Sequence, residues 1–156
     1  MFSIRKARPE DCSSIARVHS DAVRAIGPGY YSAEELESWQ RPRPVADYEQ
    51  SIQNKEFLVA TNGELIVAFG VLNPETREIE ALYTSPAVRG TGVGLNLLEQ
   101  LEQKAEEFGF TSVSLNASLN AVGFYERAGF VAQTESTYRL ASGLEIRCIP
   151  MIKRLA

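Results

Sequence analysis

The chain has 156 residues, of which 44% are hydrophobic, and its formal net charge is −4 at pH 7. This length suits a single domain over residues 1–156, and the hydrophobic content excludes a disordered chain. The acidic balance argues against nonspecific nucleic-acid binding. Because no apolar run reaches membrane-spanning length and no charged apolar leader opens the sequence, a cytoplasmic protein without membrane attachment is expected.

The first third of the chain is expected to be mainly helical. A short strand at 2–6 is predicted to precede a helix over 9–26. This helix is expected to end at Gly27-Pro28-Gly29. Ser-Ala-Glu-Glu at 32–35 is the pattern of a capping box and predicts a second short helix. Residues 45–54 are expected to add another helical turn or two.

Three strands are predicted next. The runs at 56–61 and 64–72 flank Asn62-Gly63, a strong signal for a hairpin turn. After a further turn, a third strand is expected over 77–84. Consecutive strands joined by such short turns are antiparallel.

The second half of the chain alternates helix and strand before a final hairpin. A helix is predicted at 91–108, a strand at 111–116, a helix at 120–128, and a hairpin formed by 131–140 and 144–154. The apolar residues of the first of these helices recur at helical spacing and form one side of it. They are Val93, Leu97, Leu98, Leu101, Ala105 and Phe108.

The most informative segment is Arg-Gly-Thr-Gly-Val-Gly at 89–94, between a predicted strand and a predicted helix. A glycine-rich turn opening a helix presents backbone N–H groups and the positive end of the helix dipole, which suits a diphosphate. A P-loop is excluded because no Gly-Lys-Ser/Thr is present at the turn. The dinucleotide fingerprint GxGxxG is disfavoured because Gly90, Gly92 and Gly94 are spaced as GxGxG.

A second motif follows this turn after a helix and a strand. Together, the two segments resemble the GNAT superfamily of acyl-CoA-dependent N-acetyltransferases. The residues that carry the resemblance are Arg89, Gly92 and Gly94 in the first motif and Asn120, Phe124, Tyr125, Gly129 and Phe130 in the second. The resemblance implies a mixed α/β fold (α+β), with a mostly antiparallel sheet of about seven strands flanked by about four helices. It also implies a V-shaped separation of the two middle strands.

The same resemblance implies acetyl-CoA as co-substrate and no metal. The 89–94 turn would bind the pyrophosphate. The backbone at the end of the strand predicted at 77–84 would pair with the pantetheine amides. A backbone N–H near Leu82 would polarise the thioester carbonyl. The donor-binding residues implied are Leu82, Tyr83, Thr84, Arg89, Gly90, Thr91, Gly92, Val93, Gly94, Asn116 and Asn120.

Two catalytic groups are expected. Tyr125 is the candidate general acid, since a phenol can protonate a departing thiolate of similar basicity. Glu78 and Glu80 are expected to share one face of their strand with Leu82, and Glu80 is preferred over Glu78 as the base. His19 falls within the apolar stripe of the first helix and is interpreted as a satisfied, partly buried histidine.

The acceptor site is expected to involve Tyr30, Tyr31 and Trp39. A primary amine is implied as acceptor, from a small molecule, a peptide N-terminus or a lysine, and the acidic balance favours a cationic one. The alternative function is a non-catalytic acyl-CoA-binding or sensing module on the same fold. The sequence is compatible with a monomer or a homodimer.

Overall fold

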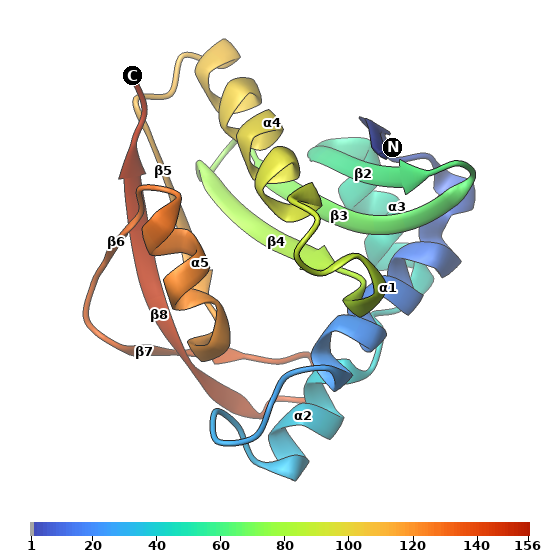
Figure 1. Cartoon of the computed structure of the whole chain (residues 1–156), viewed down its shortest axis with the longest axis vertical. Coiled ribbons are helices and arrows are strands. Elements are labelled where there is room, and N and C mark those ends of the chain that lie inside the picture. The colour runs from blue at the N-terminus through green and yellow to red at the C-terminus, as the bar shows by residue number, and fades with distance from the viewer. Residues whose placement is uncertain (1) are drawn as a thin grey trace.

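A computed structural model describes residues 2–156 (Figure 1). Short 3-10 turns at Pro9–Asp11, Pro86–Val88 and Leu119–Ala121 supplement the regular elements. In chain order, these elements are β1 (Phe2–Lys6), α1 (Cys12–Arg24), α2 (Ala33–Gln40), α3 (Val45–Asn54), β2 (Glu56–Asn62), β3 (Leu65–Asn73), β4 (Glu78–Thr84), α4 (Val93–Glu107), β5 (Ser112–Ala117), α5 (Val122–Arg127), β6 (Val131–Ala132), β7 (Ser136–Arg139) and β8 (Glu145–Arg154).

Over these residues the strands form one mixed, mostly antiparallel sheet of eight strands with five α-helices around it. The strand order is β1-β2-β3-β4-β5-β8-β6, and β7 pairs with β8. The predicted fold class is therefore confirmed. The boundaries of most elements lie within two residues of those predicted.

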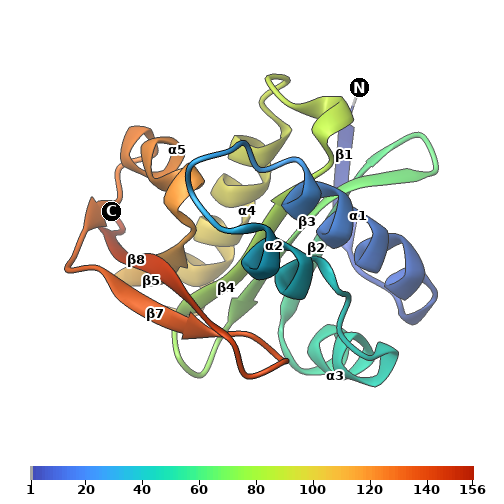
Figure 2. The same cartoon turned by 90° about the horizontal axis from the view of Figure 1, so that it is seen from below.

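Helices cover both faces of the sheet. Helices α4 and α5 lie on one face and α1 and α3 on the other, while α2 lies near one end of the sheet, below α1 (Figures 1 and 2). The core beneath α4 is centred on fully buried leucines such as Leu97, Leu98 and Leu101. The opposite core, beneath α1 and α3, contains Ile15, Val18 and the stacked rings of Phe57 and Phe69.

The two halves of the sheet separate between β4 and β5. These strands are parallel and pair only at Glu78 and Ser114. Beyond that point β4 remains paired with β3, and β5 remains paired with β8. The V-shaped separation implied by the family resemblance is therefore present (Figure 1).

The start of α2 forms the predicted capping box. The Ser32 hydroxyl accepts a hydrogen bond from Glu35 N at 3.1 Å, and Ser32 N donates to Glu35 Oε1 at 2.7 Å. Both bonds satisfy N–H groups that have no partner within the helix. The capping box therefore sets the residue at which α2 begins.

Two predictions about local structure were wrong. The expected strand at 131–140 is divided into β6 and β7, with three residues of this segment opposite two of β8. Pro150 lies in that part of β8 and has no N–H to donate, which explains the interruption. Phe108, expected on the buried side of α4, lies after its last turn and is 46% exposed.

Candidate active site

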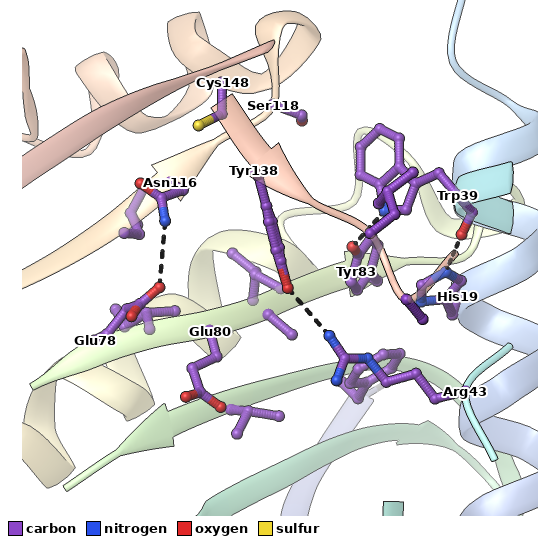
Figure 3. Close-up of a pocket in the computed structure, with 18 of the residues that line it drawn as sticks. His19, Trp39, Arg43, Glu78, Glu80, Tyr83, Asn116, Ser118, Tyr138 and Cys148 are labelled. Carbon is purple, nitrogen blue, oxygen red and sulfur yellow. Dashed lines mark hydrogen bonds between the residues drawn. The ribbon is translucent and has the colours of Figure 1, made fainter. Parts of the chain in front are cut away.

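A cavity of about 510 Å³ lies where the two halves of the sheet separate. One wall comes from β4 together with α1, α2 and α3, and the other from β5, β7 and β8 (Figure 3). The volume is in the range of small-molecule sites. Of the residues predicted for catalysis or for the acceptor, Tyr31, Trp39, Glu80 and Tyr125 line it, and Tyr30 does not.

A β-bulge in β4 sets the direction of its side chains. Val71 pairs with Ala81 and Leu72 with Ile79, so Glu80 is the extra residue. The predicted simple alternation is therefore wrong beyond Glu80, because a bulge re-aims the side chains that follow it. Leu82 packs into the core beneath α4, whereas Glu80 reaches toward the opposite layer.

Glu80 is already neutralised by its neighbours. Lys55 Nζ donates to Glu80 Oε1 at 2.6 Å, and Asn73 Nδ2 donates to Glu80 Oε2 at 3.0 Å. Both carboxylate oxygens of Glu80 are therefore engaged by partners, which leaves Glu80 less available to an acceptor amine than Glu78.

Glu78 lies closer to the point where the strands separate. Its one side-chain hydrogen bond among residues 2–156 is long, from Asn116 Nδ2 to Glu78 Oε2 at 3.5 Å. Partial burial, together with the negative charge of Glu80, raises the pKa of Glu78 above its ordinary value, and Lys55 partly opposes this effect. A carboxylate with a raised pKa in a cavity is better matched to proton transfer near neutral pH.

Tyr125 extends from α5 to the cavity and is only 7% exposed. Its ring meets those of Phe124 and Phe130 edge to face, at 5.1 Å and 5.6 Å between centroids. Burial raises the pKa of Tyr125 well above that of a free phenol, so the hydroxyl stays protonated. Among residues 2–156 no partner forms a hydrogen bond with this hydroxyl, in contrast to those of Tyr31 and Tyr83.

The glycine-rich turn lies outside the cavity, at the start of α4. Gly90 and Gly92 have φ angles of 81° and 86°, which L side chains rarely adopt. Gly92 occupies the N-cap and offers no side chain, and the first bond to its carbonyl comes from Asn96 N at 3.0 Å. Within the described chain, the N–H groups of residues 93–95 therefore have no acceptor, which leaves them available to an anion.

Gly94 connects this turn to the strand and helix beside it. A Cβ at Gly94 would lie 3.3 Å from Thr84 Cγ2 and 3.8 Å from Phe124 Cζ. The close approach brings the start of α4, the end of β4 and α5 together. Of the other predicted donor-binding residues, Arg89, Thr91 and Asn120 are exposed, and so is Asn116 on β5.

From Ile79 to Thr84, β4 has one free edge. Among the described strands only β3 pairs with this part of β4, on its other side. A strand edge exposes alternate N–H and C=O groups that an extended ligand can pair with. The backbone of Leu82, Tyr83 and Thr84 is therefore available to a ligand entering between β4 and β5.

Aromatic side chains form the end of the cavity near α2. Trp39 Nε1 donates to Tyr83 Oη at 3.1 Å, and the rings of Trp39 and Tyr31 meet at 5.5 Å. Burial raises the pKa of Tyr83 to about 12. His19 lies against the Tyr83 ring and donates from Nε2 to the Trp39 carbonyl at 2.7 Å, while burial lowers its pKa. The expected satisfied, buried histidine is present.

Tyr31 joins three segments that are distant in sequence. Its hydroxyl donates to the Arg147 carbonyl at 2.9 Å and accepts from Leu119 N at 2.8 Å. Tyr30, its neighbour, is 42% exposed and lies outside the cavity. The aromatic side chains predicted for the acceptor therefore divide into Tyr31 and Trp39 at the cavity and Tyr30 at the surface.

The cavity residues that sequence reasoning did not single out include Arg43, Lys55 and Tyr138. Arg43 lies in the loop between α2 and α3, and its Nη2 donates to Tyr138 Oη on β7 at 3.1 Å. These residues meet only through the tertiary fold, so no local pattern identifies them. The nearest signal was Arg41-Pro42-Arg43-Pro44, which marks a loop without indicating its direction.

Among residues 2–156, no group of three or more histidine, cysteine, aspartate or glutamate side chains is arranged to hold a metal ion. None of the helices in this range combines the length and apolar character required to cross a membrane. Cys12 and Cys148 are both buried free thiols.

Comparisons with known proteins match the whole of this architecture. A family model described as an acetyltransferase (GNAT) domain matches residues 29–155. A GCN5-related N-acetyltransferase structure from Rhodopseudomonas palustris, titled aminotransferase class-II, shares 28% identity over 98% of this chain and 95% of its own, with a TM-score of 0.86.

Two more distant structures show the same fold. The PaiA N-acetyltransferase of Thermoplasma acidophilum, in complex with coenzyme A, is 23% identical over 99% of both chains, with a TM-score of 0.79. The ribosomal-protein-S18-alanine N-acetyltransferase of Escherichia coli is 19% identical over 100% of this chain and 95% of its own, with a TM-score of 0.74.

Proposed function

This chain belongs to the GNAT acetyltransferase family, and we propose that it transfers an acetyl group from acetyl-CoA directly to a primary amine. The observation that carries the proposal is the convergence of three features at Gly94. The uncapped start of α4, the free edge of β4 and the helix that bears Tyr125 meet there. Each feature would bind a different part of an acyl-CoA, and together they would direct its thioester into the cavity.

The donor would bind along β4. The N–H groups at the start of α4, around Gly92 and Gly94, would hold the pyrophosphate, with the Arg89 side chain at its edge. The pantetheine arm would pair with the backbone of residues 82–84 and contact Asn116 and Asn120. A backbone N–H near Leu82 would polarise the thioester carbonyl.

We assign the base to Glu78 and keep Glu80 as the group that tunes it. An alkyl ammonium must lose a proton before its nitrogen can attack, and Glu78 would accept that proton, through a water where the reach requires it. The nitrogen then attacks the thioester carbon, a C–N bond forms and the C–S bond breaks. The second proton of the nitrogen leaves to solvent.

Tyr125 would donate its phenolic proton to the departing thiolate and be reprotonated from solvent. Because burial raises its pKa, the hydroxyl carries its proton throughout the physiological range and has it available to donate. Holding the thioester and amine in one cavity would lower the entropic part of the barrier.

The test is a panel of primary amines incubated with acetyl-CoA, with release of free thiol measured and the acetylated amine identified by mass spectrometry. Acetyl-amine formation in step with thiol release supports the proposal. Tight binding of acetyl-CoA without thiol release for any amine would instead support the alternative, an acyl-CoA-binding or sensing module.

A further inference from the structure

The charges that line the cavity do not follow the acidic balance of the whole chain. Four cationic side chains line it, Arg41, Arg43, Lys55 and Arg147, against three anionic ones, Asp47, Glu78 and Glu80. The net charge of −4 therefore arises elsewhere on the molecule. The expected preference for a cationic acceptor, which rested on that balance, has no support from the cavity lining.

The four cations differ in how far they are already neutralised. Lys55 is held by Glu80 at 2.6 Å, and Arg41 lies 3.5 Å from Glu37. Across residues 2–156, neither Arg43 nor Arg147 forms an ion pair. Arg147 Nη2 instead donates to the Tyr30 carbonyl at 3.1 Å, outside the cavity lining.

Arg43 is the unpaired cation that extends over the cavity. Figure 3 shows its guanidinium pointing toward Tyr138, across the cavity from Glu78 and Asn116. Arg43 N also donates to Tyr48 Oη at 3.3 Å, so Arg43 lies near the aromatic end. The bond to Tyr138 uses one of the five N–H donors of a guanidinium. The remaining donors suit a carboxylate, which arginine binds with two parallel hydrogen bonds.

Contacts between the two halves partly close this end of the cavity. Ser38 Oγ on α2 lies 2.5 Å from Ser142 Oγ in the β7–β8 turn. The bond from Arg43 to Tyr138 and the bond from Tyr31 to Arg147 cross the same gap. Figure 2 shows α2 between the β7–β8 hairpin on one side and α1 on the other. A small acceptor fits this partly closed end better than a folded protein does, because α2 and the hairpin are bonded to each other across it.

We propose that the acceptor is a small amine that also carries a carboxylate, bound with its carboxylate on Arg43 and its amine toward Glu78. This inference rests on the proposed acetyl transfer and specifies its substrate class. The cation and the carboxylate base at separate places in one cavity match the two charges of such an amino acid. Arg43 is thus a specificity-determining residue, which binds the acceptor and takes no part in the bond changes.

The experiment compares matched acceptors that differ only in the carboxylate. A panel of α- and ω-amino acids is assayed beside the corresponding carboxamides, with acetyl-CoA saturating and thiol release measured. For the preferred skeleton we expect kcat/KM to be at least tenfold higher for the carboxylate than for the carboxamide. The α and ω arms then show how far apart the amine and carboxylate must be.

Variants of Arg43 locate the source of that selectivity. R43Q should lower the carboxylate-to-carboxamide ratio of kcat/KM at least tenfold, mainly through KM, and R43K should retain part of it. R139Q is the control, since Arg139 is the neighbour of Tyr138 on β7, pairs with Glu145 and lies outside the cavity lining. Its ratio should match that of the wild type. Coenzyme A affinity, measured by calorimetry, reports whether R43Q is folded.

Two results would overturn the inference separately from the proposed function. One is a wild-type enzyme that acetylates amides or simple amines as well as the matching carboxylates. The other is carboxylate selectivity that survives in R43Q. Failure of acetyl-CoA to bind, or of every amine to release thiol, would instead overturn acetyl transfer, and the acceptor class with it.

Discussion

Glu78 and Glu80 lie two residues apart on β4 and line the same cavity, but only Glu80 is held by a lysine. Glu80 contacts Lys55 Nζ at 2.6 Å, while Glu78 remains where β4 and β5 separate. One carboxylate is therefore neutralised and the other stays available. The negative charge of the first contributes to the raised pKa of the second.

Replacing Glu78 tests the base directly. Glu78→Gln should lower kcat by about 10²-fold or more, the usual effect of losing a general base, and should leave coenzyme A affinity nearly unchanged. It should also remove the acid limb of the pH profile of kcat/KM, because activity in the wild type falls as Glu78 is protonated. A persisting acid limb in this variant would assign the base to another group.

Changing the neighbours of Glu78 should move that acid limb in opposite directions. The charge of Glu80 raises the pKa of Glu78 and that of Lys55 lowers it. Glu80→Gln should therefore shift the limb to lower pH, and Lys55→Met should shift it to higher pH. Profiles of kcat/KM for both variants beside the wild type provide the measurement. Shifts in the same direction, or none, would contradict this electrostatic coupling.

Tyr125→Phe should separate chemistry from binding. Because Tyr125 packs against Phe124 and Phe130, a phenylalanine keeps the packing and removes only the proton donor. The expected result is a fall in kcat of about 10²-fold or more, with the affinity for acetyl-CoA within a factor of a few of the wild type. A comparable loss in Phe124→Leu would indicate that packing at α5, rather than the hydroxyl, limits turnover.

The parts of the site that could be predicted from the sequence are those that a local sequence pattern encodes. The glycines at 90, 92 and 94 and the Phe-Tyr pair of α5 are each recognisable within a few residues. The strands and the capping box at Ser32 follow from periodicity and turn chemistry for the same reason.

What the sequence did not predict depends on tertiary contacts. The bulge at Glu80 comes from the pairing of β4 with β3, and the ion pair of Glu80 with Lys55 joins residues that are 25 positions apart. Arg43 and Tyr138 are 95 residues apart and meet only because the β7–β8 hairpin folds back toward α2. The break between β6 and β7 reflects Pro150 on a neighbouring strand rather than any residue within the break.

Tyr31→Phe should destabilise the protein. The buried hydroxyl satisfies both Leu119 N and the Arg147 carbonyl, so its removal leaves a donor and an acceptor without their partner. Losing a partner of this kind costs about 1–3 kcal/mol in free energy of unfolding, measurable by urea denaturation. Tyr30→Phe is the matched control, since Tyr30 is 42% exposed, and it should leave the free energy of unfolding within experimental error.

Gly92 variants test the anion site. Gly92→Glu and Gly92→Gln impose the same bulk and the same backbone strain at a φ of 86°, but only the glutamate repels a pyrophosphate. Calorimetry should show weaker coenzyme A binding in both variants and a further loss in the glutamate variant, which added salt reduces. Equal affinities of the two variants for coenzyme A would show that a negative charge at this position does not affect binding, which would contradict a pyrophosphate bound there.

The most direct measurement is a crystal structure of the complex with coenzyme A. We expect the pyrophosphate to lie against the N–H groups that open α4 and the pantetheine to lie along the free edge of β4. We expect the sulfur to lie within hydrogen-bonding distance of the Tyr125 hydroxyl. A pyrophosphate bound away from Gly92 and Gly94, or a sulfur out of reach of Tyr125, would contradict this expectation.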